Sequence, residues 1–108
     1  MEIKVCSTWP IIIQDRQGNS IYLTRERWEH ALDHPGMHVG LLSCVLETLR
    51  KGKRKQDPYD PAKYKYSQDF TNLPGDYTHI VVVVKFSWHS ESPRSNNFVL
   101  TAYLIEKW

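Results

Sequence analysis

The second half of the chain alternates between apolar and polar residues, which is the pattern of β-strands with one buried face. In the longest of these segments every even position from Ile80 to Trp88 is apolar, and the turn residues Leu73–Asp76 and the polar loop Ser90–Asn96 bound it. The predicted strands are Lys63–Asp69, Tyr77–Trp88 and Asn97–Ile105, with Lys53–Gln56 as a candidate for a short extra strand. Their short connections predict an antiparallel meander.

The segment before these strands has helical spacing. Thr24 is a suitable N-cap, and the first predicted helix ends at or just before His34, because Pro35 disfavours helical geometry there. A second helix is predicted from about residue 38 to residue 51, where Gly52 is a suitable C-terminal cap. Its apolar stripe consists of Leu42, Val45, Leu46 and Leu49.

The first 23 residues predict a hairpin, because the strand-like segments Trp9–Ile13 and Ile21–Leu23 flank the turn residues Gln17–Ser20. The expected fold is a single α+β domain over residues 1–108. In this layout an N-terminal hairpin (1–23) and two helices (24–52) precede an antiparallel sheet of three to four strands (53–108). Both helices are expected to pack on one face of that sheet.

The composition is that of an ordinary globular domain, with 41% hydrophobic and 24% charged residues among 108. No apolar run approaches the roughly 20 residues that span a bilayer, and the N-terminus lacks a signal pattern. Cys6 and Cys44 have no motif spacing and are expected to be reduced thiols. We expect a cytoplasmic protein with no membrane partner. The net charge of +2 permits a polyanionic partner without requiring one, and the oligomeric state stays open.

Alternation also assigns the two faces of the sheet. If the apolar sets of the last two strands face the helices, the opposite face carries Lys63, Lys65, Lys85, Thr101 and Tyr103. The same face would hold Val81, Val83 and Val99. Apolar residues there indicate a cover, which could be a partner, a ligand or the hairpin. A plain solvated surface is the alternative.

Two histidines lie one helical turn apart near the end of the first helix. His30 lies opposite the apolar stripe and is expected to face solvent, whereas His34 lies at the edge of the stripe, between helix and sheet. Three interpretations of His34 stay open: a cap of helix carbonyls, a general acid–base catalyst, or a metal ligand together with His30 and His38. No acidic or cysteine ligand is clearly placed to complete a metal site, so we expect no metal and no other cofactor.

The segment Arg50–Lys55 places five cations in six positions after the second helix. Such a run is usually solvated, but Tyr59, Tyr64 and Tyr66 follow it here. Cations that attract phosphates and rings that stack on bases favour contact with single-stranded RNA.

An ordered series of motifs carries a family resemblance. The series is Leu23-Thr24-x-x-Arg27-Trp28-x-His30-x-x-x-His34-Pro35, Leu46-x-Thr48-Leu49, Asp57-Pro58, the valine strand and Thr101-Ala102-Tyr103. Over about residues 20–106 the chain resembles the phage-type nuclease branch of the barnase–EndoU–colicin–RelE superfamily. Those domains are small metal-independent ribonucleases with helices followed by a four-stranded antiparallel sheet. Relatives often have a basic residue before the histidine and an acidic residue after the proline, where this chain has Asp33 and Gly36.

The resemblance implies a toxin-like or phage-derived endoribonuclease that cleaves RNA through attack of the 2′-hydroxyl on the adjacent phosphate. Its candidate catalytic residues are His34, Lys85 or Lys65 as the strand cation, Thr101 and Tyr103. Candidate RNA-binding residues are Arg27, His30, Lys53, Arg54, Lys55 and Lys63. RNA and a cognate inhibitor protein would be the partners. The alternative is a non-catalytic module of the same fold that binds RNA or a protein.

Overall fold

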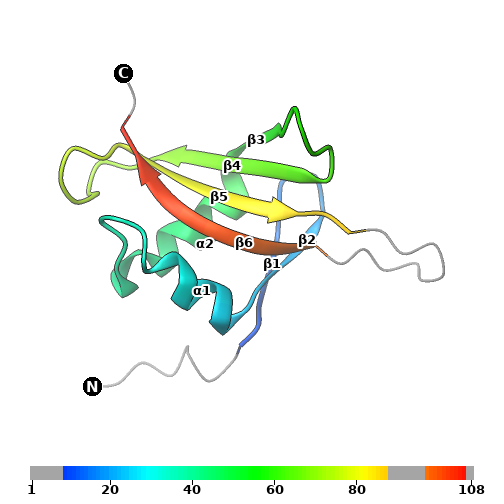
Figure 1. Cartoon of the computed structure of the whole chain (residues 1–108), viewed down its shortest axis with the longest axis horizontal. Helices are drawn as coiled ribbons and strands as arrows, with labels where there is room; N and C mark the ends of the chain where they lie inside the picture. The colour runs from blue at the N-terminus through cyan, green and yellow to red at the C-terminus, as the bar shows by residue number, and fades with distance from the viewer. Residues whose placement is uncertain (1–8, 88–96, 107–108) are drawn as a thin grey trace.

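Over the described residues the fold consists of one mixed β-sheet, two short α-helices and one 3₁₀-helix (Figure 1). A computed structural model describes residues 9–87 and 97–106. In chain order the elements are β1 (Ile11–Gln14), β2 (Ser20–Leu23), α1 (Arg25–Ala31), the 3₁₀-helix η2 (Val39–Leu41), α2 (Leu42–Lys51), β3 (Lys53–Gln56), β4 (Lys63–Asp69), β5 (His79–Lys85) and β6 (Asn97–Ile105). Within the described ranges the sheet has six strands in the order β1-β2-β6-β5-β4-β3.

The predicted layout of hairpin, two helices and a separate sheet of three to four antiparallel strands is wrong. The hairpin β1–β2 belongs to the same sheet, because β2 pairs with β6 in parallel at Ile21↔Asn97 and Tyr22↔Phe98. The Asn97 side chain supports this junction, since its Nδ2 donates to the Ser20 carbonyl at 3.1 Å. Alternation detects each strand on its own, but it says nothing about pairing between segments 77 residues apart.

The helices lie where they are predicted, but their bounds differ: α1 ends at Ala31, three residues before His34, and the second helix begins as η2 with α2 starting at Leu42. Thr24 caps α1, since its Oγ1 accepts the Arg27 amide at 3.2 Å. Strands β3, β4 and β6 have the predicted bounds, whereas β5 begins at His79 instead of Tyr77 and ends at Lys85. Residues 1–8 with Cys6, and Trp88 with the predicted loop Ser90–Asn96, lie outside the described residues. No helix in the described ranges is both long and apolar enough to cross a membrane.

The core lies between the helices and one face of the sheet. Helix α2 buries Val45 and Leu49 toward β4 and β5, and α1 buries Trp28 and Ala31 toward β6. Figure 1 shows α2 behind the sheet and α1 beside β6. The opposite face of β3, β4 and β5 therefore has no helix over it among the described residues, and we call it the open face.

A β-bulge changes which residues of β6 face the core. Val83 pairs with Thr101 but Val84 pairs with Val99, so Leu100 is an extra residue in β6. Val99 is consequently buried in the core at 1% exposure, whereas Phe98 lies opposite Lys85 and is half-buried. The expectation that Val99 lies on the open face is therefore wrong. One inserted residue reverses the faces of the strand beyond it, and the apolar alternation of β6 does not reveal where it occurs.

A buried carboxylate joins the two ends of the sheet. Asp15, in the turn of the first hairpin, accepts hydrogen bonds from the backbone of Gln17 and Asn19 at 2.9 and 2.8 Å. Its Oδ2 also accepts the Tyr66 hydroxyl of β4 at 2.5 Å and lies 4.0 Å from Arg54 of β3. The hairpin at one end of the strand order therefore contacts the strands at the other end.

These contacts change the protonation of both partners. Burial by itself would raise the pKa of Asp15, but the hydrogen bonds from Tyr66, Asn19 and Gln17 outweigh it and hold the pKa below its ordinary value of 3.8. Burial and the hydrogen bond to Asp15 raise the pKa of Tyr66 far above its ordinary value, so its hydroxyl stays protonated and remains a donor.

The first prediction concerns the Tyr66 hydroxyl. In Tyr66→Phe the buried Asp15 carboxylate loses a donor, so we expect the free energy of unfolding at neutral pH to fall by about 1–3 kcal/mol, measured by urea denaturation. Tyr59→Phe is the matched control, because Tyr59 is 94% exposed and its hydroxyl should matter little. Wild-type stability in Tyr66→Phe would contradict the role of this contact.

The second prediction concerns acid stability. Because folding lowers the pKa of Asp15, the unfolded chain holds the proton more tightly. The stabilisation is therefore complete above the unfolded pKa and is lost as the pH falls through the folded pKa. Urea denaturation at a series of pH values should show a flatter decline below about pH 4 for Asp15→Asn than for the wild type. Parallel declines would show that Asp15 does not carry this dependence.

Candidate functional site

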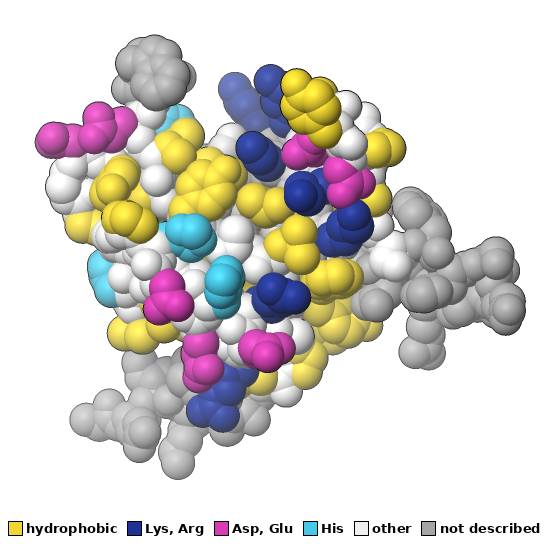
Figure 2. All heavy atoms as spheres, in the orientation of Figure 1, with side chains coloured by type: hydrophobic (Ala, Val, Ile, Leu, Met, Phe, Trp, Pro, Cys, Tyr) yellow, Lys and Arg dark blue, Asp and Glu magenta, His cyan; other side chains and the backbone are white. Residues whose placement is uncertain are grey.

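The candidate site lies on the open face of the sheet, at the side where α1 meets β6. Figure 2 looks onto this face and shows histidine side chains near its centre, with lysine and arginine side chains gathered toward β3 and β4. Two groups of residues make up the site.

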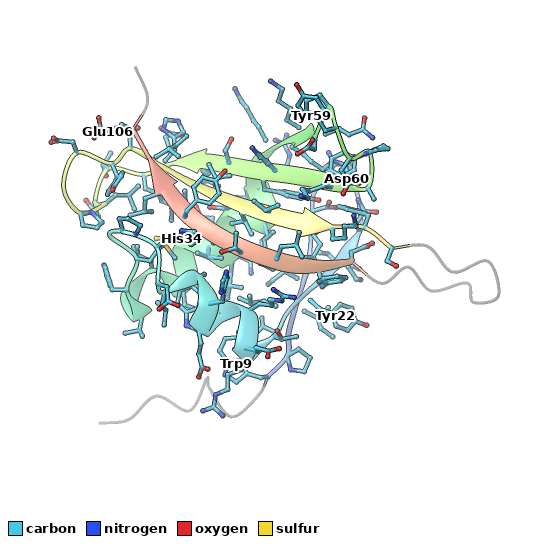
Figure 3. The ribbon with its side chains drawn as sticks, viewed as in Figure 1. Trp9, Tyr22, His34, Tyr59, Asp60 and Glu106 are labelled. Carbon is cyan, nitrogen blue, oxygen red and sulfur yellow. The ribbon has the colours of Figure 1, made fainter. Side chains whose placement is uncertain are left out.

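The first group centres on His34, in the turn after α1, and Figure 3 shows it beside β6. Its Nε2 lies 3.0 Å from Thr101 Oγ1, and its ring centroid lies 5.8 Å from that of Tyr103. The ring of His30, one turn earlier, meets His34 edge-on at 6.1 Å. We call His34, Thr101 and Tyr103 the histidine cluster. As predicted, His34 is half-buried at the seam and His30 is exposed.

The turn that carries His34 requires a glycine two residues later. Gly36 has a φ of +81°, a conformation that side chains disfavour. A Cβ at this position would lie 2.8 Å from Leu104 Cδ1 and 2.9 Å from Tyr77 Cε2. The positive φ and the close packing therefore give a steric reason for a glycine after Pro35.

The second group is a set of lysines that the strand register places on the same face. Lys55 of β3 pairs with Lys65 of β4, which pairs with Val83 of β5, which in turn pairs with Thr101 of β6. Lys53 and Lys63 lie two positions to either side of this row, on β3 and β4. We call Lys53, Lys55, Lys63, Lys65 and Lys85 the lysine face. It leads across the sheet to the histidine cluster.

Within the part of the chain that the structure describes, Lys85 differs from the other four lysines because it forms an ion pair. Its Nζ donates to Asp60 Oδ2 at 2.6 Å, and this hydrogen bond lowers the pKa of Asp60 below its ordinary value. It lies opposite Phe98, whereas Lys65 is the lysine in line with Thr101. Of the two candidate strand cations, Lys65 therefore has the better position. No pattern in the sequence indicates the Asp60 partner, which belongs to the β3–β4 connection.

Arg54 does not belong to the lysine face, although it is part of the same basic run. Its guanidinium lies 4.4 Å from the Tyr64 ring centroid and 5.6 Å from that of Phe86, and it approaches Asp15. Tyr64 is half-buried beside it, and Tyr66 is buried. This candidate RNA contact thus has a structural role. Arg27 remains available, because it precedes His30 by three residues and shares its side of α1.

The two valines of the open face are covered from within the sheet. Val81 is 5% exposed and Val83 is 8% exposed, yet neither belongs to the core cluster. Val83 has Lys65 and Thr101 as its neighbours across the strands, and lysine stems commonly cover apolar surface. The hairpin that was considered as a cover instead extends the sheet beside β6. The buried valines alone therefore do not require an external partner.

Other parts of the molecule provide weaker candidates for a functional site than the open face does. No group of three or more histidine, cysteine or acidic side chains suited to a metal ion occurs among residues 9–87 and 97–106. His38 accepts the Gly40 amide at its Nδ1, at 3.1 Å. A groove of about 1190 Å³ opens near the end of β6, with Lys53, Asp69 and His79 in its lining, but the histidine cluster does not line it.

No protein-family model, no curated protein and no solved structure matches this chain. The geometry of the open face is consequently the basis for any functional conclusion.

The third prediction tests the contact within the histidine cluster. Thr101→Val keeps the shape of the side chain but removes the hydroxyl, so the His34 imidazole loses its partner at Nε2. We expect the ¹⁵N and ¹H signals of the His34 ring to shift, because tautomer and orientation depend on that partner. The ring signals of His38, which has a separate backbone partner, should stay in place. Unchanged His34 signals in a folded variant would rule out the contact.

Proposed function

We propose that this protein is a metal-independent endoribonuclease that acts on single-stranded RNA at its open sheet face. The observation that carries the proposal is the 3.0 Å contact of His34 with Thr101, beside Tyr103 and in line with Lys65. It joins a titratable group, two hydroxyls and a cation on one accessible surface. Transesterification of RNA uses groups of these kinds, since it needs proton transfer and stabilisation of a charged phosphorane.

Each group has a role in the proposed reaction. His34 takes the proton of the 2′-hydroxyl while that oxygen forms its bond to phosphorus. The bond from phosphorus to the 5′-oxygen breaks, and the leaving oxygen takes a proton from the Tyr103 hydroxyl. Thr101 holds the imidazole in place, and Lys65 stabilises the charge on the non-bridging oxygens. The products are a 2′,3′-cyclic phosphate and a 5′-hydroxyl, and proton exchange with solvent restores His34 and Tyr103.

The position of Lys65 supports this assignment. Its Cα and that of Thr101 are separated by two strand spacings, or about 10 Å, with the small side chain of Val83 between them. A phosphate could lie between the ammonium and the histidine cluster. Lys65 also lies directly opposite Lys55, and like charges in such a pair destabilise a sheet. A bound phosphate would relieve this repulsion.

A second candidate function is RNA binding without cleavage. The observation that favours it is the extent of the lysine face, which spans three strands, β3, β4 and β5, and lies largely beyond the histidine cluster. A surface of this kind binds a phosphate chain whether or not a reaction follows. The two functions differ in turnover, and the next experiment separates them.

The fourth prediction is cleavage of RNA in the presence of excess EDTA. We expect wild-type protein to convert single-stranded RNA into fragments that end in 2′,3′-cyclic phosphate. His34→Gln should lower the cleavage rate about 10²–10⁴-fold, as expected for loss of an acid–base group. His79→Gln is the matched control, because His79 is a half-buried histidine on β5 whose Nδ1 contacts Thr78.

The lysines provide a second comparison in the same assay. Lys65→Met should reduce the cleavage rate more than Lys85→Met, because Asp60 already neutralises Lys85. Activity that requires a metal, or that survives in His34→Gln, would contradict the proposed site. Salt-dependent binding without turnover in the wild type would favour the second candidate function.

A further inference from the structure

Tyr59 is an aromatic residue whose exposure has no structural explanation. Its side chain is 94% exposed, and Figure 3 shows it in the connection between β3 and β4, near Asp60. Tyr64 and Tyr66, the other tyrosines of this region, are turned toward the interior. Of the three rings that follow the basic run, Tyr59 is thus the one that a ligand can reach.

The connection that carries Tyr59 is held by its own hydrogen bonds. Asp57 Oδ1 accepts the amides of Tyr59 and Asp60 at 2.7 and 3.2 Å, and Asp60 Oδ1 accepts the Ala62 amide at 3.1 Å. The Asp57 amide donates to the Lys63 carbonyl at 2.8 Å, which closes the connection. The ion pair of Asp60 with Lys85 anchors it to β5. The backbone at Tyr59 is therefore constrained before any ligand binds.

The surroundings of Tyr59 favour an anionic ligand. Lys55 lies two residues before the connection begins at Asp57, and Lys63 lies where it ends. Neither lysine forms an ion pair within residues 9–87 and 97–106. The nearby carboxylates are already engaged, since Asp60 pairs with Lys85 and Asp57 accepts backbone amides. An exposed ring on a constrained support beside unpaired lysines matches the way proteins bind single-stranded nucleic acid.

We propose that Tyr59 is a stacking subsite for an unpaired base of single-stranded RNA, with Lys55 and Lys63 contacting the adjoining phosphates. The inference rests on the proposed function, because it assumes that RNA occupies the open face. The subsite lies at the β3–β4 end of the lysine face and the histidine cluster lies at β6, so the stacked base is a few nucleotides from the cleaved bond. A base held in a duplex cannot present its face to the ring, so the subsite selects single strands.

The fifth prediction tests this subsite by binding, in the His34→Gln background so that the RNA stays intact. The probe is a short fluorescently labelled single-stranded RNA of mixed sequence, followed by anisotropy. Tyr59→Ala should weaken binding about 5- to 150-fold, the range for loss of one stacked base. Tyr59→Phe should bind the RNA with the affinity of the parent, because it keeps the ring. Tyr59→Leu should lose as much affinity as Tyr59→Ala does. Val39→Ala, at a site that is 71% exposed on η2, should bind like the parent.

Two further measurements identify what the ring contacts. Tyr59→Ala should leave the salt dependence of binding unchanged, while Lys55→Ala should reduce its slope by about 0.7. The same RNA annealed to its complement should bind equally well with and without the Tyr59 ring. The subsite would be overturned if Tyr59→Ala or Tyr59→Leu kept the parent's affinity for single-stranded RNA. It would also be overturned if Tyr59→Ala lost as much affinity for duplex RNA as for the single strand.

The outcomes for the subsite and for the activity are separable. A loss of single-strand binding in Tyr59→Ala, with no cleavage by the protein that retains His34, would support the subsite and contradict the ribonuclease. Cleavage dependent on His34, with unchanged binding in Tyr59→Ala, would support the ribonuclease and overturn the subsite.

Discussion

The hydrogen bond between Tyr66 and Asp15 holds the first hairpin against the opposite end of the sheet. Strands β1 and β3 are the two edges of the strand order, yet the turn after β1 reaches the side chains of β3 and β4. The sheet must therefore curl around α2, which places its core face inside and leaves the lysine face outside. A buried carboxylate is stable only when donors surround it, and Asp15 has them from its own turn and from β4.

The tertiary fold also brings together residues that lie far apart in the chain. His34 and Thr101 are separated by 67 positions, and they meet because α1 packs beside β6, where that strand is no longer paired with β2. The bulge at Leu100 then decides which hydroxyls and rings are presented there. Thr101 and Tyr103 stay on the open face, and beyond the bulge Phe98 joins Lys85 on it. A sheet without the bulge would bury Phe98 and expose Val99 instead.

The lysine face combines two physical tendencies that usually oppose each other. Lysine stems cover apolar surface, and here Lys65 lies beside Val83 in place of a second layer. Their ammonium groups repel one another, and among the described residues only Lys85 of this set has an acidic partner. The arrangement thus stabilises the sheet through its carbon chains while it leaves a local excess of positive charge. This excess of positive charge supports the proposal of an anionic chain as the partner.

Local patterns in the sequence determined the strands, the helix caps and the residue types of the candidate site. Thr24 and Gly52 mark helix ends because capping depends on residues a few positions apart, and the bounds of β4 and β6 follow from alternation within one strand. His34 at the seam and the lysines on one face follow from the same short-range periodicities. Only the tertiary structure decided the parallel pairing of β2 with β6, the position of the bulge, and the partners of Lys85 and Arg54. These features depend on contacts between distant segments, and local periodicity does not encode them.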